Sequence, residues 1–140
     1  MDSQETKRNP TFPYLEAVIA ALLGIASVIL PVWLLSLKPY PAPLFPLIRT
    51  GVEGMSALTL VFLLISGVLL GVFGRGHPIL LGLATLALLP CAAIAEMVAS
   101  PTSHSMWPFE FAIYGLLSLI AVLGAFVGRL VKMRFCKGEV

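Results

Sequence analysis

Residues 79–99 read ILLGLATLALLPCAAIAEMVA, and Glu96 is the only charged residue among them. A helix needs about 20 apolar residues to cross a hydrocarbon core of roughly 30 Å, so this stretch is long enough to span a bilayer. Its apolar residues do not alternate strictly with polar ones, which excludes a barrel strand, and a helix satisfies its own backbone hydrogen bonds in lipid. We therefore predict a transmembrane helix at 79–99.

The rest of the chain has the same character. Further apolar stretches cover residues 15–37, 52–73 and 111–131; hydrophobic residues make up 59% of the 140-residue chain and charged residues 11%. The mean hydropathy is +0.99. Soluble domains of this length carry a smaller apolar fraction. The sequence thus predicts an all-α integral membrane protein with four transmembrane helices.

Little of the chain is left outside these spans. We expect a short N-terminal tail at residues 1–14, a four-helix transmembrane domain at 15–131 and a basic C-terminal tail at 132–140. Any functional site must therefore lie in the bundle, its loops or its tails.

The distribution of positive charge predicts the orientation. With the N-terminus in the cytoplasm, only Lys38 and Arg49 fall on the outer side. Cytoplasmic loops are enriched in Lys and Arg, so both termini are predicted to be cytoplasmic. Compact loops and the lack of an organelle-targeting presequence favour a prokaryotic cytoplasmic membrane. The residues on the inner side are Lys7, Arg8, Arg75, Arg129, Lys132, Arg134 and Lys137.

Similar segments in the two halves of the chain suggest a repeat. Residues 22–27, LLGIAS, resemble residues 80–85, LLGLAT, and residues 70–75 resemble residues 123–129 if one residue is inserted. These matches support the hypothesis of two tandem helical hairpins in parallel orientation, as in parallel-repeat transporters. Chance similarity is the alternative, because membrane spans draw on few residue types.

Glycines spaced four apart indicate helix faces that approach a neighbour closely. Gly67 and Gly71 lie in the second span, and Gly124 and Gly128 in the fourth. Such spacing lets helix backbones come into contact. We expect these faces to pack within the bundle, and dimerisation is the alternative.

Two prolines are predicted to bend the helices. Pro31 and Pro90 lie inside the first and third spans, and each removes one backbone hydrogen bond. Bent helices could open a small cavity toward the outside, although proline is also common in membrane helices for packing alone.

No complete ligand set for a cofactor is present. Cys91 and Cys136 are predicted at different depths and form no Cys-x-x-Cys motif, and His77 and His104 fall in loops on opposite sides. This argues against a thiol redox pair or an axial haem pair. We expect no cofactor, and we interpret Cys91 as a small packing residue.

The acidic residues form the one constellation with functional meaning. The topology places Glu53, Glu96 and Glu110 near the outer surface. Glu96 stands out because it lies toward a helix C-terminus, where negative charge is disfavoured, while the other two open helices. An acidic residue within a span marks a functional-site hypothesis. Pairing with Arg49 would make Glu96 structural, whereas crowding with the other glutamates would raise a carboxyl pKa.

His104 completes a candidate outer-face polar cluster with Glu53, Glu96 and Glu110. Histidine and carboxylates are competent zinc ligands and proton relays. Scattered ligands nevertheless specify a metal far less than a His-Glu-x-x-His motif does, so no metal site is predicted.

The first outer segment, residues 38–49, is rich in proline yet apolar. Proline fixes φ and favours an extended residue before it, so we expect a stiff strap along the outer interface.

Three classes of function remain. We favour a non-enzymatic structural or accessory subunit that contacts the lipid bilayer and either a second copy or a partner membrane subunit, because no catalytic set is complete. A small proton-linked transporter using Glu96 is one alternative. An integral membrane enzyme or metal site at the outer face is the other. A nucleic-acid partner is not expected, since no basic folded surface is present.

Overall fold

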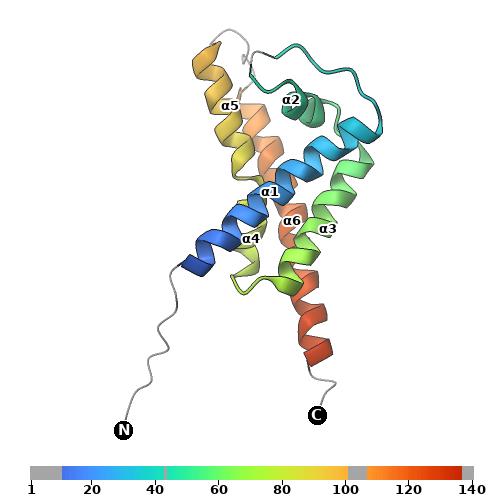
Figure 1. Ribbon diagram of the computed structural model, residues 1–140, viewed down its shortest axis with the longest axis vertical. Coiled ribbons are helices and arrows are strands. Elements are labelled where there is room, and N and C mark those ends of the chain that lie inside the picture. Colours follow the sequence, from blue (N-terminus) through green and yellow to red (C-terminus); the bar gives the residue numbers. More distant parts are fainter. Residues whose placement is uncertain (1–10, 43, 101–106, 137–140) are drawn as a thin grey trace.

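The computed structural model describes residues 11–42, 44–100 and 107–136. Within these residues the chain is entirely helical apart from turns and loops, which confirms the predicted all-α class (Figure 1). The helices are α1 (Thr11–Leu34), α2 (Pro46–Glu53), α3 (Ala57–Phe73), α4 (Pro78–Leu86), α5 (Leu88–Ala99) and α6 (Trp107–Cys136).

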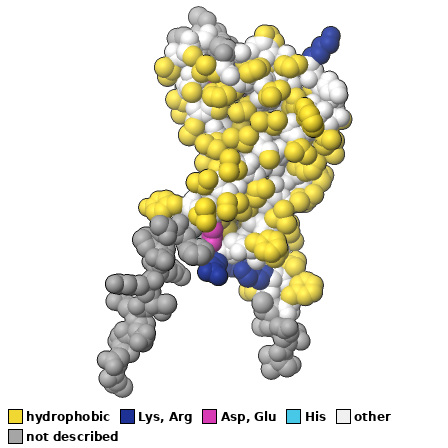
Figure 2. All heavy atoms as spheres, viewed as in Figure 1, with side chains coloured by type: hydrophobic (Ala, Val, Ile, Leu, Met, Phe, Trp, Pro, Cys, Tyr) yellow, Lys and Arg dark blue, Asp and Glu magenta, His cyan; other side chains and the backbone are white. Residues whose placement is uncertain are grey.

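Several of these helices are long and apolar enough to cross a membrane. In the described part of the chain the candidate spans are Tyr14–Leu34, Pro78–Ala99 and Pro108–Phe135, with a fourth if the bent pair α2 and α3 counts as one span. Figure 2 shows apolar side chains covering the outside of the bundle between its two ends. The protein is therefore an all-α membrane protein.

The end of α1 explains why this helix stops before the predicted residue 37. Ser36 adopts a left-handed φ of 49°. Its N–H donates to the Trp33 carbonyl at 3.2 Å, and the Leu37 N–H donates to the Val32 carbonyl at 3.0 Å. This pair of bonds defines a Schellman cap, in which glycine usually occupies the left-handed position. Pro31, by contrast, lies inside α1 without ending it.

The predicted second span, 52–73, is wrong at its start. α2 and α3 are bent by 104° at the break between them, so α2 lies across the end of the bundle. The Gly54 N–H caps α2 by donating to Thr50 O, and the Ser56 side chain caps α3 by accepting from Thr59 N. α3 retains 17 residues, at the lower end of the roughly 17–25 that a span requires.

The predicted extended strap is also wrong in part. From Pro46 onward the segment forms α2 instead of continuing as an extended chain. Proline is favoured at the first helical position, because its missing N–H would have no partner there. A salt bridge between Arg49 and Glu53, one turn apart, supports this short helix.

The third span is broken between α4 and α5. At the break, the Ala87 N–H bonds the Ala84 carbonyl, a tighter turn than an α-helical one. Pro90 accounts for the position, because a proline has no N–H for the carbonyl four residues earlier and its ring pushes that carbonyl aside. α5 consequently continues as a separate helix toward the α2 end of the molecule (Figure 1).

α3 and α6 cross with their backbones in contact. A Cβ added to Gly67 would overlap the carbonyl oxygen of Ala121, and one added to Gly124 would overlap that of Leu64. The other two glycines of the pairs, Gly71 and Gly128, are equally constrained, by the carbonyl oxygens of Ala125 and Val68. All the predicted packing glycines thus lie at this one crossing.

The contacts on the two sides of the crossing are equivalent, but they match the glycines differently from the sequence comparison. Gly67 and Gly124 have equivalent surroundings, as do Gly71 and Gly128, whereas the comparison of residues 70–75 with 123–129 had matched Gly71 with Gly124. The tandem-hairpin hypothesis remains untested.

One stripe of small residues in the third span faces away from the bundle. Ala87, Cys91 and Ala95 are exposed on the isolated chain. The interpretation of Cys91 as a packing residue inside this bundle is therefore wrong.

The opposite end of the bundle, which we call the basic end, joins the start of α1, the α3–α4 turn and the end of α6. The Glu16 carboxylate accepts from Arg75 N at 3.1 Å and from Gly76 N at 2.9 Å. Arg129 donates to Gly76 O at 3.2 Å and Lys132 to Gly74 O at 3.4 Å. Figure 2 shows basic and acidic side chains next to each other at this end, with a further basic side chain at the opposite end.

Ser36→Gly is expected to stabilise the protein. A side chain in the left-handed region costs about 1 kcal/mol, and glycine removes this cost. Thermal unfolding in detergent should show a higher midpoint for Ser36→Gly than for wild type. Ser36→Ala, which keeps the Cβ, should show no increase, and an equal gain in both variants would contradict the assignment.

Gly71→Ala is expected to loosen the α3–α6 crossing. The new methyl must displace the Ala125 carbonyl, and overpacking of this kind costs about 1–3 kcal/mol. Unfolding in mixed detergent micelles measures the loss. Gly115→Ala is the matched control, because no heavy atom lies within 4 Å of a Cβ at Gly115 of α6. The expectation fails if both variants are equally stable.

Candidate functional site

A cavity of about 280 Å³ lies at the α2 end of the bundle, between α2, α5 and α6. It is the meeting point of the broken spans, because α2 turns across the bundle and α5 follows the break at Ala87. Its lining combines apolar and aromatic side chains with charged ones. The lining residues are Phe45, Ile48, Arg49, Val52, Glu53, Leu89, Ala92, Ala93, Glu96, Phe109, Glu110, Ile113 and Tyr114.

The helix α2 forms one wall because its apolar side is held against the core. Ile48 and Val52 pack against the buried cluster that includes Val28, Leu89 and Tyr114. Gly51 lets α2 approach α1, since a Cβ there would lie 2.6 Å from the Val28 carbonyl oxygen. The charged side chains of α2 are consequently left at the cavity.

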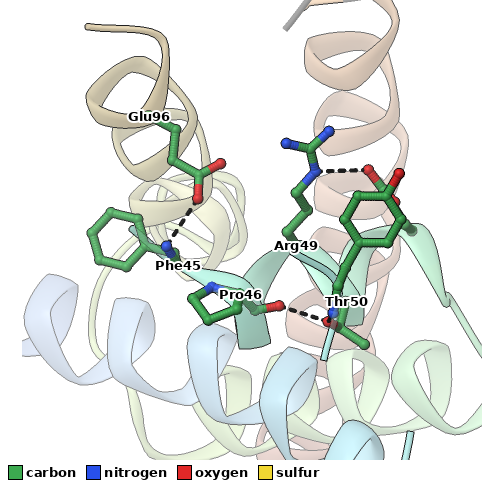
Figure 3. Close-up of polar contacts among 7 residues, drawn as sticks. Phe45, Pro46, Arg49, Thr50 and Glu96 are labelled. Atoms are coloured by element: carbon green, nitrogen blue, oxygen red, sulfur yellow. Dashed lines mark hydrogen bonds and ion pairs between the residues drawn. The ribbon is translucent and has the colours of Figure 1, made fainter. Parts of the chain in front are cut away.

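Glu96 joins α5 to the start of α2. Its side chain is only 4% exposed, and its Oε1 accepts a hydrogen bond of 2.9 Å from Phe45 N (Figure 3). Phe45 immediately precedes α2, so the carboxylate also lies at the positive end of that helix dipole. The backbone partner was not among the expected ones, which were Arg49, His104 and the other glutamates.

Arg49 and Glu53 form an ion pair on α2. The Arg49 Nε lies 2.9 Å from Glu53 Oε1, and the guanidinium carbon lies 5.1 Å from the centroid of the Tyr40 ring. Since α2 lies outside the α3 span, these groups belong to the end of the bundle. The hydrogen bond to Glu53 raises the pKa of Arg49 above its ordinary value; burial opposes this, and the charges of Glu53, Glu110 and Glu96 add to it. The guanidinium therefore stays charged.

The structure changes the reading of Glu53. Glu53 was expected to open the second span, where a helix N-terminus would favour its charge. It is instead the last residue of α2, where the helix dipole disfavours a negative charge, and Arg49 one turn earlier compensates. Glu110 does lie in the first turn of α6, as expected.

Thr50 fastens the preceding loop onto α2. Its buried hydroxyl donates to Pro46 O at 2.6 Å and accepts from Tyr40 N at 2.7 Å (Figure 3). These bonds hold Tyr40 beside α2, close to the Arg49 guanidinium. The loop before α2 is thereby folded back over this end of the bundle.

The structure brings Glu53, Glu96 and Glu110 to one cavity. His104 lies outside the described residues. Among the residues that are described, no group of three or more His, Cys, Asp or Glu side chains could hold a metal ion. Among the described residues, three carboxylates and one guanidinium line the cavity, an excess of two negative charges when all are ionised.

Sequence reasoning did not find α2, which supplies two of these charged groups. The signals were present: Pro46 at the start, Gly54 after the end, and Arg49 and Glu53 spaced four apart. They were overlooked because the proline-rich segment was interpreted as extended. Tyr114 is buried and also lines the cavity.

Together, the fold and this cavity define an all-α membrane protein with a charged, partly apolar hollow at one end. No family model, curated protein or solved structure matches the chain. The function must therefore be argued from the cavity itself.

Glu96→Leu is expected to release the start of α2. The Phe45 N–H loses its acceptor, and leaving a partly buried donor unpaired costs about 1 kcal/mol or more. Hydrogen exchange at the Phe45 amide should accelerate on the order of tenfold or more. Glu96→Gln keeps a carbonyl acceptor and should exchange more slowly than Glu96→Leu. Unchanged exchange in Glu96→Leu would show that this bond does not hold α2.

Proposed function

We propose that this protein is a non-enzymatic membrane protein, an accessory subunit whose outer end binds a ligand or a partner. The observation that carries this proposal is the cavity between α2, α5 and α6, where Glu53, Glu96, Glu110 and Arg49 meet apolar and aromatic walls. Binding sites of this kind combine a mostly apolar surface with a few placed polar groups.

The cavity supports binding better than it supports catalysis. Three of its described charged groups already serve the structure, because Arg49 pairs with Glu53 and Glu96 accepts from Phe45 N. General acid–base or nucleophilic catalysis would require a nucleophile and a base within hydrogen-bond reach of each other. A subunit that binds through the cavity requires neither.

The proposed orientation places the cavity on the outer side of a prokaryotic cytoplasmic membrane. Arg75, Arg129 and Lys132 lie at the basic end, opposite α2, and the positive-inside tendency assigns that end to the cytoplasm. Both termini would then be cytoplasmic in a multi-pass protein.

Photo-crosslinking tests this role on the full chain in its native membrane. A benzophenone amino acid at Phe109, which lines the cavity and is 70% exposed, should give a discrete cross-linked product. The same substitution at Phe135, which is 79% exposed near the opposite end of α6, is the matched control. The product mass separates a second copy from a different subunit. Identical products from both positions, or none from Phe109, would contradict the proposal.

A second candidate is a small proton-linked carrier. It is favoured by the buried carboxylate of Glu96, which lies six residues beyond Pro90 in the same span. In proteoliposomes loaded with a pH-sensitive dye, wild type should then move protons down an imposed gradient and Glu96→Gln should not. Equal proton flux in the two proteins would rule out this role of Glu96.

A further inference from the structure

We propose that the cavity binds a small amphipathic organic cation: one ammonium group carried on an apolar body. This inference rests on the proposed binding role of the cavity and names the chemical class of its ligand. It is carried by the size, charge and wall composition of the cavity together.

The charge of the cavity selects a cation. In the described lining, three carboxylates outnumber one guanidinium, and that guanidinium is held against Glu53 by a 2.9 Å ion pair. A ligand that covers these groups removes water from them, and a buried charge without a countercharge is costly. A positive ligand compensates for that cost, and a neutral one does not.

The described residues of the cavity do not favour an anionic ligand. The start of α2 would be the natural anion site at this end, because a helix N-terminus presents backbone N–H groups and a positive dipole end. The Glu96 carboxylate already occupies that position, 2.9 Å from Phe45 N (Figure 3). A lipid headgroup is also disfavoured, because its phosphate would meet the excess negative charge of the cavity lining.

The walls select an organic cation over a metal ion. Within the described residues the carboxylates do not form a metal-binding group. The space between them is bounded by Phe109, Tyr114 and Ile113. Aromatic faces attract alkylammonium groups, and apolar walls accept the rest of the ligand. The volume of about 280 Å³ lies just below the range of roughly 300–1,000 Å³ typical of small-molecule sites, which suits a small ligand.

The carboxylates that line the cavity differ in their exposure to solvent. The Glu53 side chain is 40% exposed, whereas Glu96 is 4% exposed. A cation is therefore met first by an accessible carboxylate and then by a buried one, where its attraction is less screened by solvent.

Calorimetric titration of the full chain in a non-ionic detergent tests the proposal. The probe is benzyltrimethylammonium, with benzyl alcohol as the uncharged comparison and benzoate as the anionic one. We expect saturable binding of the cation only. Glu110→Gln should weaken it by about tenfold, the order expected for one charge at a partly buried site. Glu16→Gln removes the same charge at the basic end, where the amide oxygen can still accept from Gly76 N, and should leave the affinity unchanged.

A steric variant locates the binding. Ile113→Trp fills the cavity without changing its charge and should abolish binding, with the thermal midpoint measured to confirm that the variant is folded. Full affinity in folded Ile113→Trp would place the cation elsewhere and overturn the proposal. Equal affinity in Glu110→Gln and wild type would also overturn it.

The outcomes separate this inference from the proposed function. Binding of benzoate in place of the cation overturns the ligand class but leaves the cavity as a binding site. If no probe binds while Phe109 still gives its specific cross-linked product, the ligand class is wrong and the binding role stands. If both results are negative, the inference and the proposed function fail together.

Discussion

The rest of the bundle depends on the contact between the backbones of α3 and α6. In a bilayer the hydrophobic effect does not drive helices together, so close packing of small residues has to do so. Gly67 and Gly71 on one helix and Gly124 and Gly128 on the other provide that packing. The crossing fixes α6, and the start of α6 then forms the wall of the cavity that faces α2 and α5. A site at one end thus relies on a contact nearer the middle.

The sequence was sufficient for the class of the fold because lipid permits few alternatives. Long apolar stretches such as 79–99 and 111–131 must be helical, since their backbone groups have no other partners. The same reasoning failed where local chemistry overrides hydropathy. Gly54 and Ser56 interrupt an apolar stretch with two helix caps, and Pro46 starts a helix inside a segment that its prolines made look extended.

Of the site, the sequence predicted only which acidic residues lie together. Topology alone predicted that Glu53, Glu96 and Glu110 lie at the same end, and they line one cavity. The partner of Glu96 was not predictable, because a backbone N–H carries no signature in the sequence. The role of Glu53 was misread because it depends on which helix the residue belongs to. Residue types identify a polar end, but the bend between α2 and α3 determines the arrangement within it.

The contacts of α1 have a consequence for the order of assembly. Glu16 binds the amides of Arg75 and Gly76, and Ser27 shares a 2.8 Å hydrogen bond with Ser66. These partners lie 39 to 60 residues later in the chain. During synthesis the first helix must therefore reside in the lipid without these contacts until α3 and the α3–α4 turn have been made. The helix that enters the membrane first therefore cannot be fixed by these bonds before residue 76 has been made.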